Sequence, residues 1–299
     1  MQKIAIVGLG RMGFSMAERL LKFNHRVIAY NRSPEKTRAI TRKGAEPAFS
    51  LQELVAKFGK EKRLIWLMLP AGKVTDEMID DLLPLLKSGD IMVNGANAFY
   101  KNVQTQSKRC QKYGVYLFDA GVSGGIWGLT RGYALMLGGP RAQFKYIEPF
   151  CKDLAPQNGY GYFGESGAGH FVKSVHNIIE YTYMQGLAEG MELLNGFNQK
   201  INLLKAAETW QPASIVSSAL LDWMVAGLKR QDFKNIGTEI GSVTIQELQD
   251  TVKAVKGYAP AFATAVKIRK DKSNKFALGK RVIAATRREF GGHAVVKSR

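Results

Sequence analysis

Five polar residues suited to acid and base chemistry recur at helical spacing near the middle of the chain. They are Lys173, His176, Asn177, Glu180 and Tyr181. On an α-helix, which advances about 100° per residue, all five fall on one side and the apolar residues between them on the other. An ordinary solvated helix face is the alternative, but such a face more often carries Lys, Glu, Gln and Ala. The spacing predicts a helix with one packed face and one face that does chemistry.

Within this set, the lysine and the glutamate provide two separate proton-transfer groups. A partly desolvated ammonium loses its proton more easily, so Lys173 can act as a base, and Glu180 can then supply a proton. Gly167 and Gly169 precede the helix and allow it to start close to another backbone or a ligand. We expect the polar face to line a gap between two domains, where a ligand would lie. For His170 a hydrogen-bonded structural role is favoured over a functional one.

A second pattern, G-x-G-x-x-G, lies between an apolar run and a helical run at the start of the chain. It consists of Gly8, Leu9, Gly10, Arg11, Met12 and Gly13. In such a pattern the first glycine permits a tight turn, the second lets a pyrophosphate approach the backbone, and the third lets helix and strand pack closely. A plain glycine-rich turn is the alternative. The context of the pattern favours dinucleotide binding.

The end of the second apolar run bears on the choice of coenzyme. It reads Asn31-Arg32-Ser33, with no Asp or Glu to bind the ribose 2′-hydroxyl of NAD. A guanidinium and a hydroxyl can instead pair with a 2′-phosphate. We therefore expect these three residues to contact the coenzyme and NADP to be favoured over NAD, with an ordinary exposed arginine as the alternative.

The elements that must position these residues follow from the hydrophobic pattern. Five short apolar runs, typical of buried parallel strands, occupy residues 2–7, 26–30, 64–69, 90–94 and 115–119. Helical patterns separate them, which predicts a Rossmann-type doubly wound sheet, and hence an α/β fold. After residue 164 the strand signal fades and long helical periodicities follow. We expect a dinucleotide-binding domain over 1–164 and an all-helical domain over 165–299.

Composition excludes several other classes of protein. The 299 residues are 45% hydrophobic and 23% charged, as in a globular protein, and no run reaches the roughly 18 apolar residues of a membrane helix. The two cysteines, Cys110 and Cys151, stand in no metal-binding or disulfide pattern. No secretory signal precedes the first strand. We expect a cytoplasmic protein with no metal and no membrane association.

The net charge of +18 is concentrated near the end of the chain, where residues 253–299 hold 13 basic and two acidic side chains. Such a segment is either an anion site, which another subunit can complete, or a solvated basic face. Nucleic acid is not expected as a partner, because no helix-turn-helix, zinc finger or RNA-binding aromatic motif accompanies the charge. A regulatory protein that binds a dinucleotide and nucleic acid is the weakest alternative.

Several motifs together resemble the 6-phosphogluconate dehydrogenases, in the short bacterial form of that family within the β-hydroxyacid dehydrogenases. They are GLGRMG, MLPAGKVTDEMID, NGANAFY, DAGVSGGIWGLTRGYALMLGG, GAGHFVKSVHNIIEYTYMQGLAEG and RREFGGHAVVK. Relatives that act on 3-hydroxyisobutyrate or glyoxylate share the glycine loop and a Lys-x-x-x-Asn pair, but lack the His, Glu and Tyr. Another β-hydroxyacid dehydrogenase or an aldehyde reductase is the nearest alternative.

The resemblance implies oxidative decarboxylation of 6-phosphogluconate to ribulose 5-phosphate and CO2 with reduction of a nicotinamide coenzyme. Lys173 would take the C3 hydroxyl proton and Glu180 would protonate C1 of the enediol left by decarboxylation. His176 and Asn177 would bind substrate hydroxyls. The other implied substrate contacts come from the glycine-rich segment and the NGAN turn: Asn97, Ser123, Gly124 and Gly125.

For the substrate phosphate, the resemblance implies four residues. Tyr181 and Arg269 would come from one chain, and Arg287 and His293 from the tail of a partner subunit. The resemblance therefore implies a homo-oligomer, at least a dimer, in which the helical domain over 165–299 binds substrate and forms the dimer. The sequence departs from the family pattern at Asn94, where Asp is expected, at Ala96, where Gly is expected, and at Ile126 and Trp127, where the long form has acidic residues.

Overall fold

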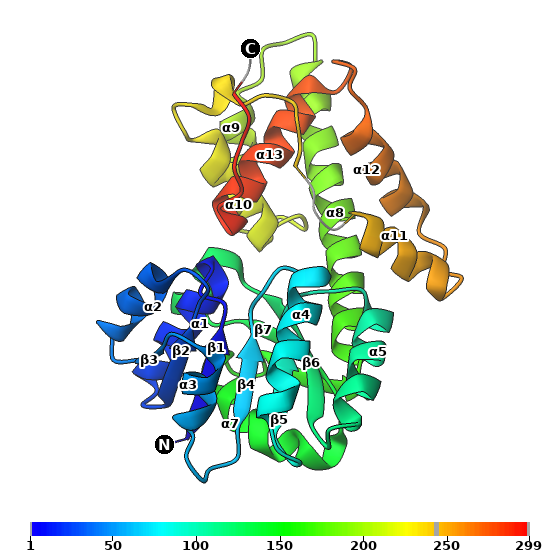
Figure 1. The fold of residues 1–299 in the computed structure, drawn as a ribbon. Coiled ribbons are helices and arrows are strands. Elements are labelled where there is room, and N and C mark those ends of the chain that lie inside the picture. Colours follow the sequence, from blue (N-terminus) through cyan, green and yellow to red (C-terminus); the bar gives the residue numbers. More distant parts are fainter. Residues whose placement is uncertain (1, 242–244, 298–299) are drawn as a thin grey trace. The chain divides into compact units, whose positions relative to one another are not determined.

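A computed structural model describes residues 2–241 and 245–297. The chain divides into two compact units, Met1–Ser174 and Val175–Arg299, each described here by itself (Figure 1). Unit 1 holds an eight-stranded sheet in the order β3-β2-β1-β4-β5-β6-β7-β8. The strands are β1 Lys3–Val7, β2 Arg26–Tyr30, β3 Glu46–Ala48, β4 Leu64–Leu67, β5 Ile91–Asn94, β6 Tyr116–Ser123, β7 Ala134–Gly138 and β8 Tyr160–Gly164.

The α-helices of unit 1 follow the strands in the alternation that the sequence predicts. They are α1 Arg11–Lys22, α2 Pro34–Thr41, α3 Leu51–Ala56, α4 Lys73–Leu82, α5 Tyr100–Gln111, α6 Gly128–Arg131 and α7 Phe144–Leu154. Helix α8, Ala168–Asn195, begins in unit 1 and continues into unit 2. The predicted Rossmann-type sheet followed by helices is confirmed.

The sheet is mixed rather than wholly parallel. Strand β7 pairs antiparallel with β6, while the other neighbouring pairs are parallel. Only two short helical turns, the 3-10 helix η2 (Gly125–Trp127) and α6, join β6 to β7, and a parallel pair needs a longer crossover. Strand β3 was not predicted, because its sequence Glu46-Pro47-Ala48 has no apolar run. It lies at the edge of the sheet, where a proline is tolerated.

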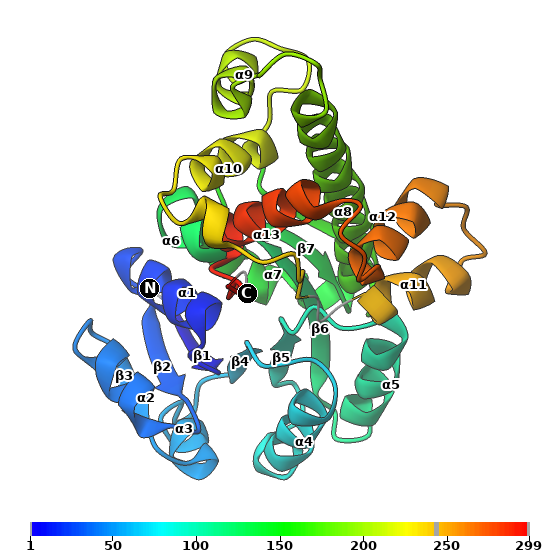
Figure 2. The ribbon, with the colours of Figure 1, turned by 90° about the horizontal axis from the view of Figure 1, so that it is seen from above.

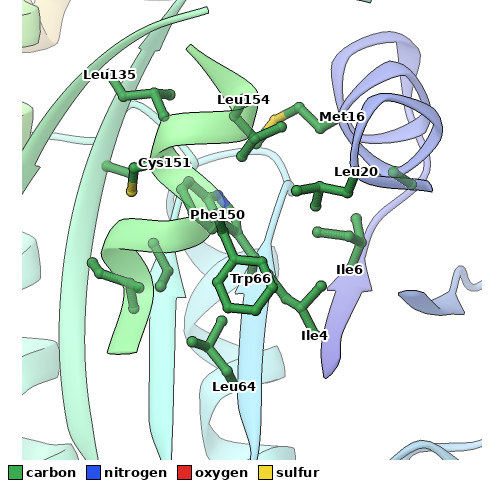
Figure 3. Close-up of a cluster of buried hydrophobic side chains, with 14 of the residues drawn as sticks. Ile4, Ile6, Met16, Leu20, Leu64, Trp66, Leu135, Phe150, Cys151 and Leu154 are labelled. Carbon is green, nitrogen blue, oxygen red and sulfur yellow. The ribbon is translucent and has the colours of Figure 1, made fainter. Parts of the chain in front are cut away.

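Alternating residues of the strands belong to two hydrophobic layers, one on each face of the sheet. Ile4 and Ile6 of β1 face a layer with α1 and α7, whereas Ala5 and Val7 face a layer with α3, α4 and α5. Figure 3 shows side chains of α1 and α7 packed over Trp66 of β4. This two-sided burial explains why the strands read as continuous apolar runs.

Unit 2 is built from helices. After α8 they are α9 Leu203–Trp210, α10 Ala219–Leu228, α11 Ile245–Ala254, α12 Pro260–Lys270 and α13 Ala277–Gly291. Helix α13 packs along α10, and both share a core with α8 and α9 (Figure 2). A second apolar cluster joins α8 to α11 and α12 around Tyr181. None of the described helices combines the length and apolar character needed to span a membrane.

Candidate active site

The glycine turn lies at the carboxyl edge of the sheet, between β1 and α1. Gly8 has a φ of +94°, and its N–H donates to the Tyr30 carbonyl at 2.9 Å. A Cβ on Gly13 would collide with the Gly8 carbonyl oxygen, so close packing of helix and strand requires a glycine there. At Gly10, by contrast, an added Cβ would meet nothing within 4 Å. The turn is thus tight on the protein side and open at its middle glycine.

The start of α1 suits an anion. Gly10 is the N-cap residue, no side chain caps the helix, and no acidic residue stands in its first turn. Phe14 N is the first helical donor, with Gly10 O as its acceptor at 2.9 Å, which leaves the preceding N–H groups without a helical acceptor. A pyrophosphate fits such a helix start in charge and in hydrogen bonding.

The three residues that follow β2, Asn31 to Ser33, have two different roles. The Asn31 amide accepts from Leu9 N at 2.8 Å and donates to Ser33 O at 3.1 Å, so it ties the glycine turn to β2. The side chains of Arg32 and Ser33 are exposed and make no hydrogen bond or ion pair within the described residues. A guanidinium and a hydroxyl are therefore available to a ligand beside the glycine turn.

The NGAN turn follows β5 at the same edge. Asn94 accepts from Ala96 N at 2.9 Å, as an aspartate would, and its amide nitrogen donates to Gln106 Oε1 at 2.8 Å. Asn97 has a φ of +49°, accepts from Val122 N at 3.0 Å and donates to Val122 O at 3.3 Å. Its amide thus fastens the turn to the end of β6, directly before Ser123.

A buried carboxylate, which the sequence reasoning missed, holds the start of α8. Asp119 of β6 is fully buried and accepts from Gly167 N and His170 N, both at 2.6 Å. A charged residue inside an otherwise apolar strand was the available signal. A Cβ on Gly121 would collide with the Lys173 Cβ, so the lysine lies directly against β6. Lys173 is 6% exposed.

His170 is buried one turn before Lys173. Its Nε2 lies 3.1 Å from the Asn94 carbonyl oxygen, and because a carbonyl only accepts, Nε2 is the donor. Burial lowers the pKa of this imidazole, and the opposing charge of Asp119 does not offset the burial. The structure gives His170 the hydrogen-bonded role that the sequence favoured.

This burial makes stability depend on pH. The folded protein holds His170 neutral, whereas the unfolded chain binds a proton near the ordinary pKa of 6.5. We expect the free energy of unfolding to fall below pH 6.5, by at most about 1.4 kcal/mol per pH unit from this group. The free energies of unfolding of the wild type and of His170→Gln are measured in urea melts between pH 8 and pH 5. As the pH falls below 6.5, the wild type should lose stability relative to the variant by up to this amount. Parallel curves would show that His170 carries no such linkage.

The part of α8 in unit 2 carries the remaining polar residues of the helix. His176 Nδ1 lies 3.0 Å from Asn177 Oδ1 and 3.9 Å from Glu180 Oε2. These side chains are partly exposed. The predicted helical set is thus on one continuous helix, with Lys173 in unit 1 and the other four residues in unit 2.

Two buried arginines lie beside Tyr181. The Arg269 guanidinium stacks on the Tyr181 ring at 3.7 Å, is 7% exposed, and none of its three nitrogens has a hydrogen-bond partner among the described residues. Burial lowers the pKa of Arg269 to about 10. Arg287 is also buried, which lowers its pKa, and the neighbouring Tyr181 and Glu180 side chains act in the opposite direction. A buried cation without an acceptor is costly, so the cluster is suited to an anion.

Two of the predicted phosphate contacts, Arg287 and His293, lie near the end of the chain. Arg287 reaches the vicinity of Tyr181 within its own chain, because α13 packs in the core of unit 2, and it donates to the Gly241 carbonyl. His293 contacts the Phe290 ring, with centroids 6.1 Å apart. Beyond it, Lys297 bridges to Ile236 of the same chain.

The described residues contain no cluster of three His, Cys, Asp or Glu side chains that could hold a metal ion. Cys110 and Cys151 are free and buried.

Comparison with known proteins agrees with this picture. Residues 3–164 match the family described as the NAD binding domain of 6-phosphogluconate dehydrogenase. A Haloferax volcanii protein named NAD(+)-dependent, decarboxylating 6-phosphogluconate dehydrogenase is 38% identical over 81% of this chain and 78% of its own length. A Bacillus subtilis protein, provisionally named 6-phosphogluconate dehydrogenase YqeC, is 32% identical over 99% of both chains.

Solved structures share the fold. The Plasmodium falciparum 6-phosphogluconate dehydrogenase has a TM-score of 0.79 at 24% identity, covering 89% of this chain and 61% of that one. The 3-hydroxyisobutyrate dehydrogenase of Mycobacterium tuberculosis has a TM-score of 0.73 at 21% identity, covering 96% and 99%. Together with the glycine turn, the α8 residues and the sequence matches, these findings identify the chain as a short-form member of the 6-phosphogluconate dehydrogenase family and a nicotinamide-dependent oxidoreductase.

Proposed function

We propose that this protein oxidises and decarboxylates 6-phosphogluconate to ribulose 5-phosphate and CO2, with NADP as the coenzyme. The observation that carries the proposal is the buried Arg269 guanidinium, which has no acceptor among the described residues, stacks on Tyr181 and lies near Arg287. Two arginines match a dianionic phosphate in charge and geometry. A hydroxy acid without a phosphate would leave Arg269 unpaired.

The proposed reaction divides its proton transfers between two residues of α8. When bound, the nicotinamide supplies one function, acceptance of a hydride from C3 of the substrate. Lys173 takes the proton of the C3 hydroxyl as that hydride leaves, so that a 3-keto acid forms. The resulting ammonium then donates a hydrogen bond to the C3 oxygen as the C1 carboxylate departs as CO2. Glu180 gives a proton to the enediol carbon, C1 of the product.

Helix geometry is consistent with these two roles. Glu180 is seven residues after Lys173 on one continuous helix, so the two fall on the same side, about 10 Å apart along the axis. In this proposal His176 and Asn177 bind substrate hydroxyls, and the turn Ser123, Gly124 and Gly125 holds the sugar acid. Asn97 contributes its remaining amide hydrogen where sugar and nicotinamide meet.

The family resemblance also suggests a homodimer in which the tail with His293 completes the phosphate site of a partner. We propose this assembly, and a cytoplasmic location, for this protein. Unlike Arg287, His293 makes its described ring contact with Phe290 at the surface of the Tyr181 cluster. A partner contribution would therefore concern His293.

The choice of NADP rests on the end of β2. The Haloferax volcanii relative is named NAD(+)-dependent, so the family name alone does not decide the coenzyme. Here the Asn31 amide is committed to Leu9 N, no carboxylate stands nearby in the sequence, and the exposed Arg32 and Ser33 side chains can pair with a 2′-phosphate.

Arg32→Ala should therefore change the coenzyme preference. Loss of a charge-assisted hydrogen bond to the 2′-phosphate should lower kcat/KM for NADP by about 10-fold to 100-fold. The value for NAD, which lacks that phosphate, should change less than about threefold and serves as the internal control. Initial rates with each coenzyme at saturating 6-phosphogluconate give both numbers. Equal effects on the two coenzymes would remove Arg32 from this role.

The substrate is tested by comparing three hydroxy acids: 6-phosphogluconate, gluconate and 3-hydroxyisobutyrate. If the Arg269 cluster binds phosphate, kcat/KM for 6-phosphogluconate should exceed that for gluconate by at least about 100-fold. Equal efficiency with gluconate, or preference for 3-hydroxyisobutyrate, would instead favour another β-hydroxyacid dehydrogenase.

A further inference from the structure

The first turns of α8 lie directly on the sheet backbone of unit 1. A Cβ on Gly169 would collide with the Met136 carbonyl oxygen and would lie 2.8 Å from the Asp119 carbonyl oxygen. Gly121 is the corresponding close approach on the strand side, against Lys173. The Asp119 carboxylate accepts the N–H groups of Gly167 and His170. The base therefore sits on a helix turn whose distance from β6 is fixed by glycine contacts and a buried carboxylate.

The NGAN turn is a separate segment, and it needs its own connection to this helix turn. Its Asn97 amide binds both polar groups of the Val122 backbone, which sets it against β6 directly before Ser123. The Asn94 side chain holds Ala96 N on one side and Gln106 on the other. These bonds attach the turn to β6 and α5, but not to α8.

The His170 imidazole makes a polar connection to α8, in addition to the ring contact between Tyr100 and Phe171. It is 1% exposed, and its Nε2 donates to the Asn94 carbonyl at 3.1 Å, at the point where β5 ends and the NGAN turn begins. Lys173 follows on the next turn of the same helix. Nδ1 is buried without a partner that meets hydrogen-bond geometry among the described residues, and the Ala120 backbone of β6 also lies near the ring, so the Nε2 contact is the link of this side chain to the NGAN turn.

We propose that His170 is a positioning residue for the oxidation step. Its hydrogen bond holds the turn bearing Asn97 against the helix turn bearing Lys173, so that the base keeps a fixed spacing to the groups that hold the C3 hydroxyl. The inference rests on the proposed function. It goes beyond the residues that contact substrate, because His170 acts through Asn94 and Lys173.

The test compares two replacements at one position. Gln can place an amide donor near the position of Nε2, whereas Phe keeps a planar ring and removes the donor. With 6-phosphogluconate and NADP, His170→Phe should lower kcat by about 10-fold to 100-fold, the scale expected from a misplacement of about 1 Å, with KM changed less than about threefold. His170→Gln should recover most of kcat. With substrate deuterated at C3, the isotope effect on kcat should increase in His170→Phe, because hydride transfer becomes slower.

His25 provides a matched control. It is also buried in unit 1, and its Nε2 lies 2.6 Å from Asp153 Oδ2, but it precedes β2 at the amino edge of the sheet. His25→Phe should lower the Tm and leave kcat and the isotope effect unchanged. If His170→Phe does not fold, His170→Asn serves instead, because its shorter amide cannot reach the Asn94 carbonyl.

The outcomes separate this inference from the function on which it rests. A kcat within threefold of wild type in a folded variant without the donor would overturn it. So would equal losses in the Gln and Phe variants with an unchanged isotope effect, since these indicate a purely structural histidine. A wild-type protein that does not turn over 6-phosphogluconate would instead contradict the proposed function, and the inference would fall with it.

Discussion

Replacing Lys173 by methionine should lower kcat for 6-phosphogluconate by about 10²-fold to 10⁴-fold, the range expected for loss of a general base. The lysine is 6% exposed and lies against Gly121 of β6, so a water molecule cannot readily reach its position and act as the base instead. Methionine has a similar length and is apolar, so the fold should be retained. Coenzyme binding should be unchanged, because the glycine turn belongs to β1 and α1. Steady-state rates and a coenzyme titration by fluorescence measure the two quantities.

Two further variants complete this test. Lys173→Arg keeps a positive charge but cannot lose its proton near neutral pH, so it should be as inactive as Lys173→Met. Lys152 of α7, whose side chain is 59% exposed, is a matched control, and Lys152→Met should retain wild-type rates. A Lys173→Met protein with kcat within tenfold of wild type would show that another group removes the C3 hydroxyl proton.

Replacing Arg269 by methionine should move activity and stability in opposite directions. In the described residues its guanidinium is buried without a hydrogen-bond partner, so the free protein bears the cost of that charge. Its removal should raise the Tm. The substrate phosphate would lose its buried partner, which should lower kcat/KM for 6-phosphogluconate by about 30-fold or more, corresponding to at least about 2 kcal/mol. Thermal melts without substrate and initial rates measure the two effects.

Arg281 of α13 is the matched control for Arg269. Its Nε donates to the Ile236 carbonyl at 2.8 Å, so this arginine has the acceptor that Arg269 lacks. Arg281→Met should lower the Tm and leave kcat/KM unchanged, the reverse of both effects. An Arg269→Met protein with a lower Tm and an unchanged kcat/KM would assign that arginine to packing alone.

The sequence predicted those features of the fold that depend on local patterns. Strands β1, β2, β4, β5 and β6 were recognisable because burial on both faces makes each a continuous apolar run. The glycine turn was recognisable because its steric demands fall on three nearby positions. Strand β3 escaped because an edge strand of three residues needs no apolar run.

The arrangement of the site depends on contacts between distant residues. The pattern on α8 predicted which residues share one helix face, but not which residues of other elements contact them. Helical spacing brought together Lys173 through Tyr181, but nothing local shows that Arg269 stacks on Tyr181 or that Arg287 joins it from its own chain. Asp119 was missed because the N–H groups from which it accepts lie at the start of a helix far along the chain. Asn31 was predicted to contact the coenzyme, and the structure adds a role that the sequence did not show, because its amide oxygen accepts from Leu9 N and so connects β2 to the glycine turn.

The most direct test of the central claim is the stoichiometry of the wild-type reaction. Purified protein is supplied with 6-phosphogluconate and NADP, and reduced coenzyme, CO2 and ribulose 5-phosphate are measured together. The proposed chemistry predicts equal amounts of all three from the first turnovers onward. Reduced coenzyme without CO2, or no turnover of 6-phosphogluconate beside turnover of an unphosphorylated hydroxy acid, would contradict it.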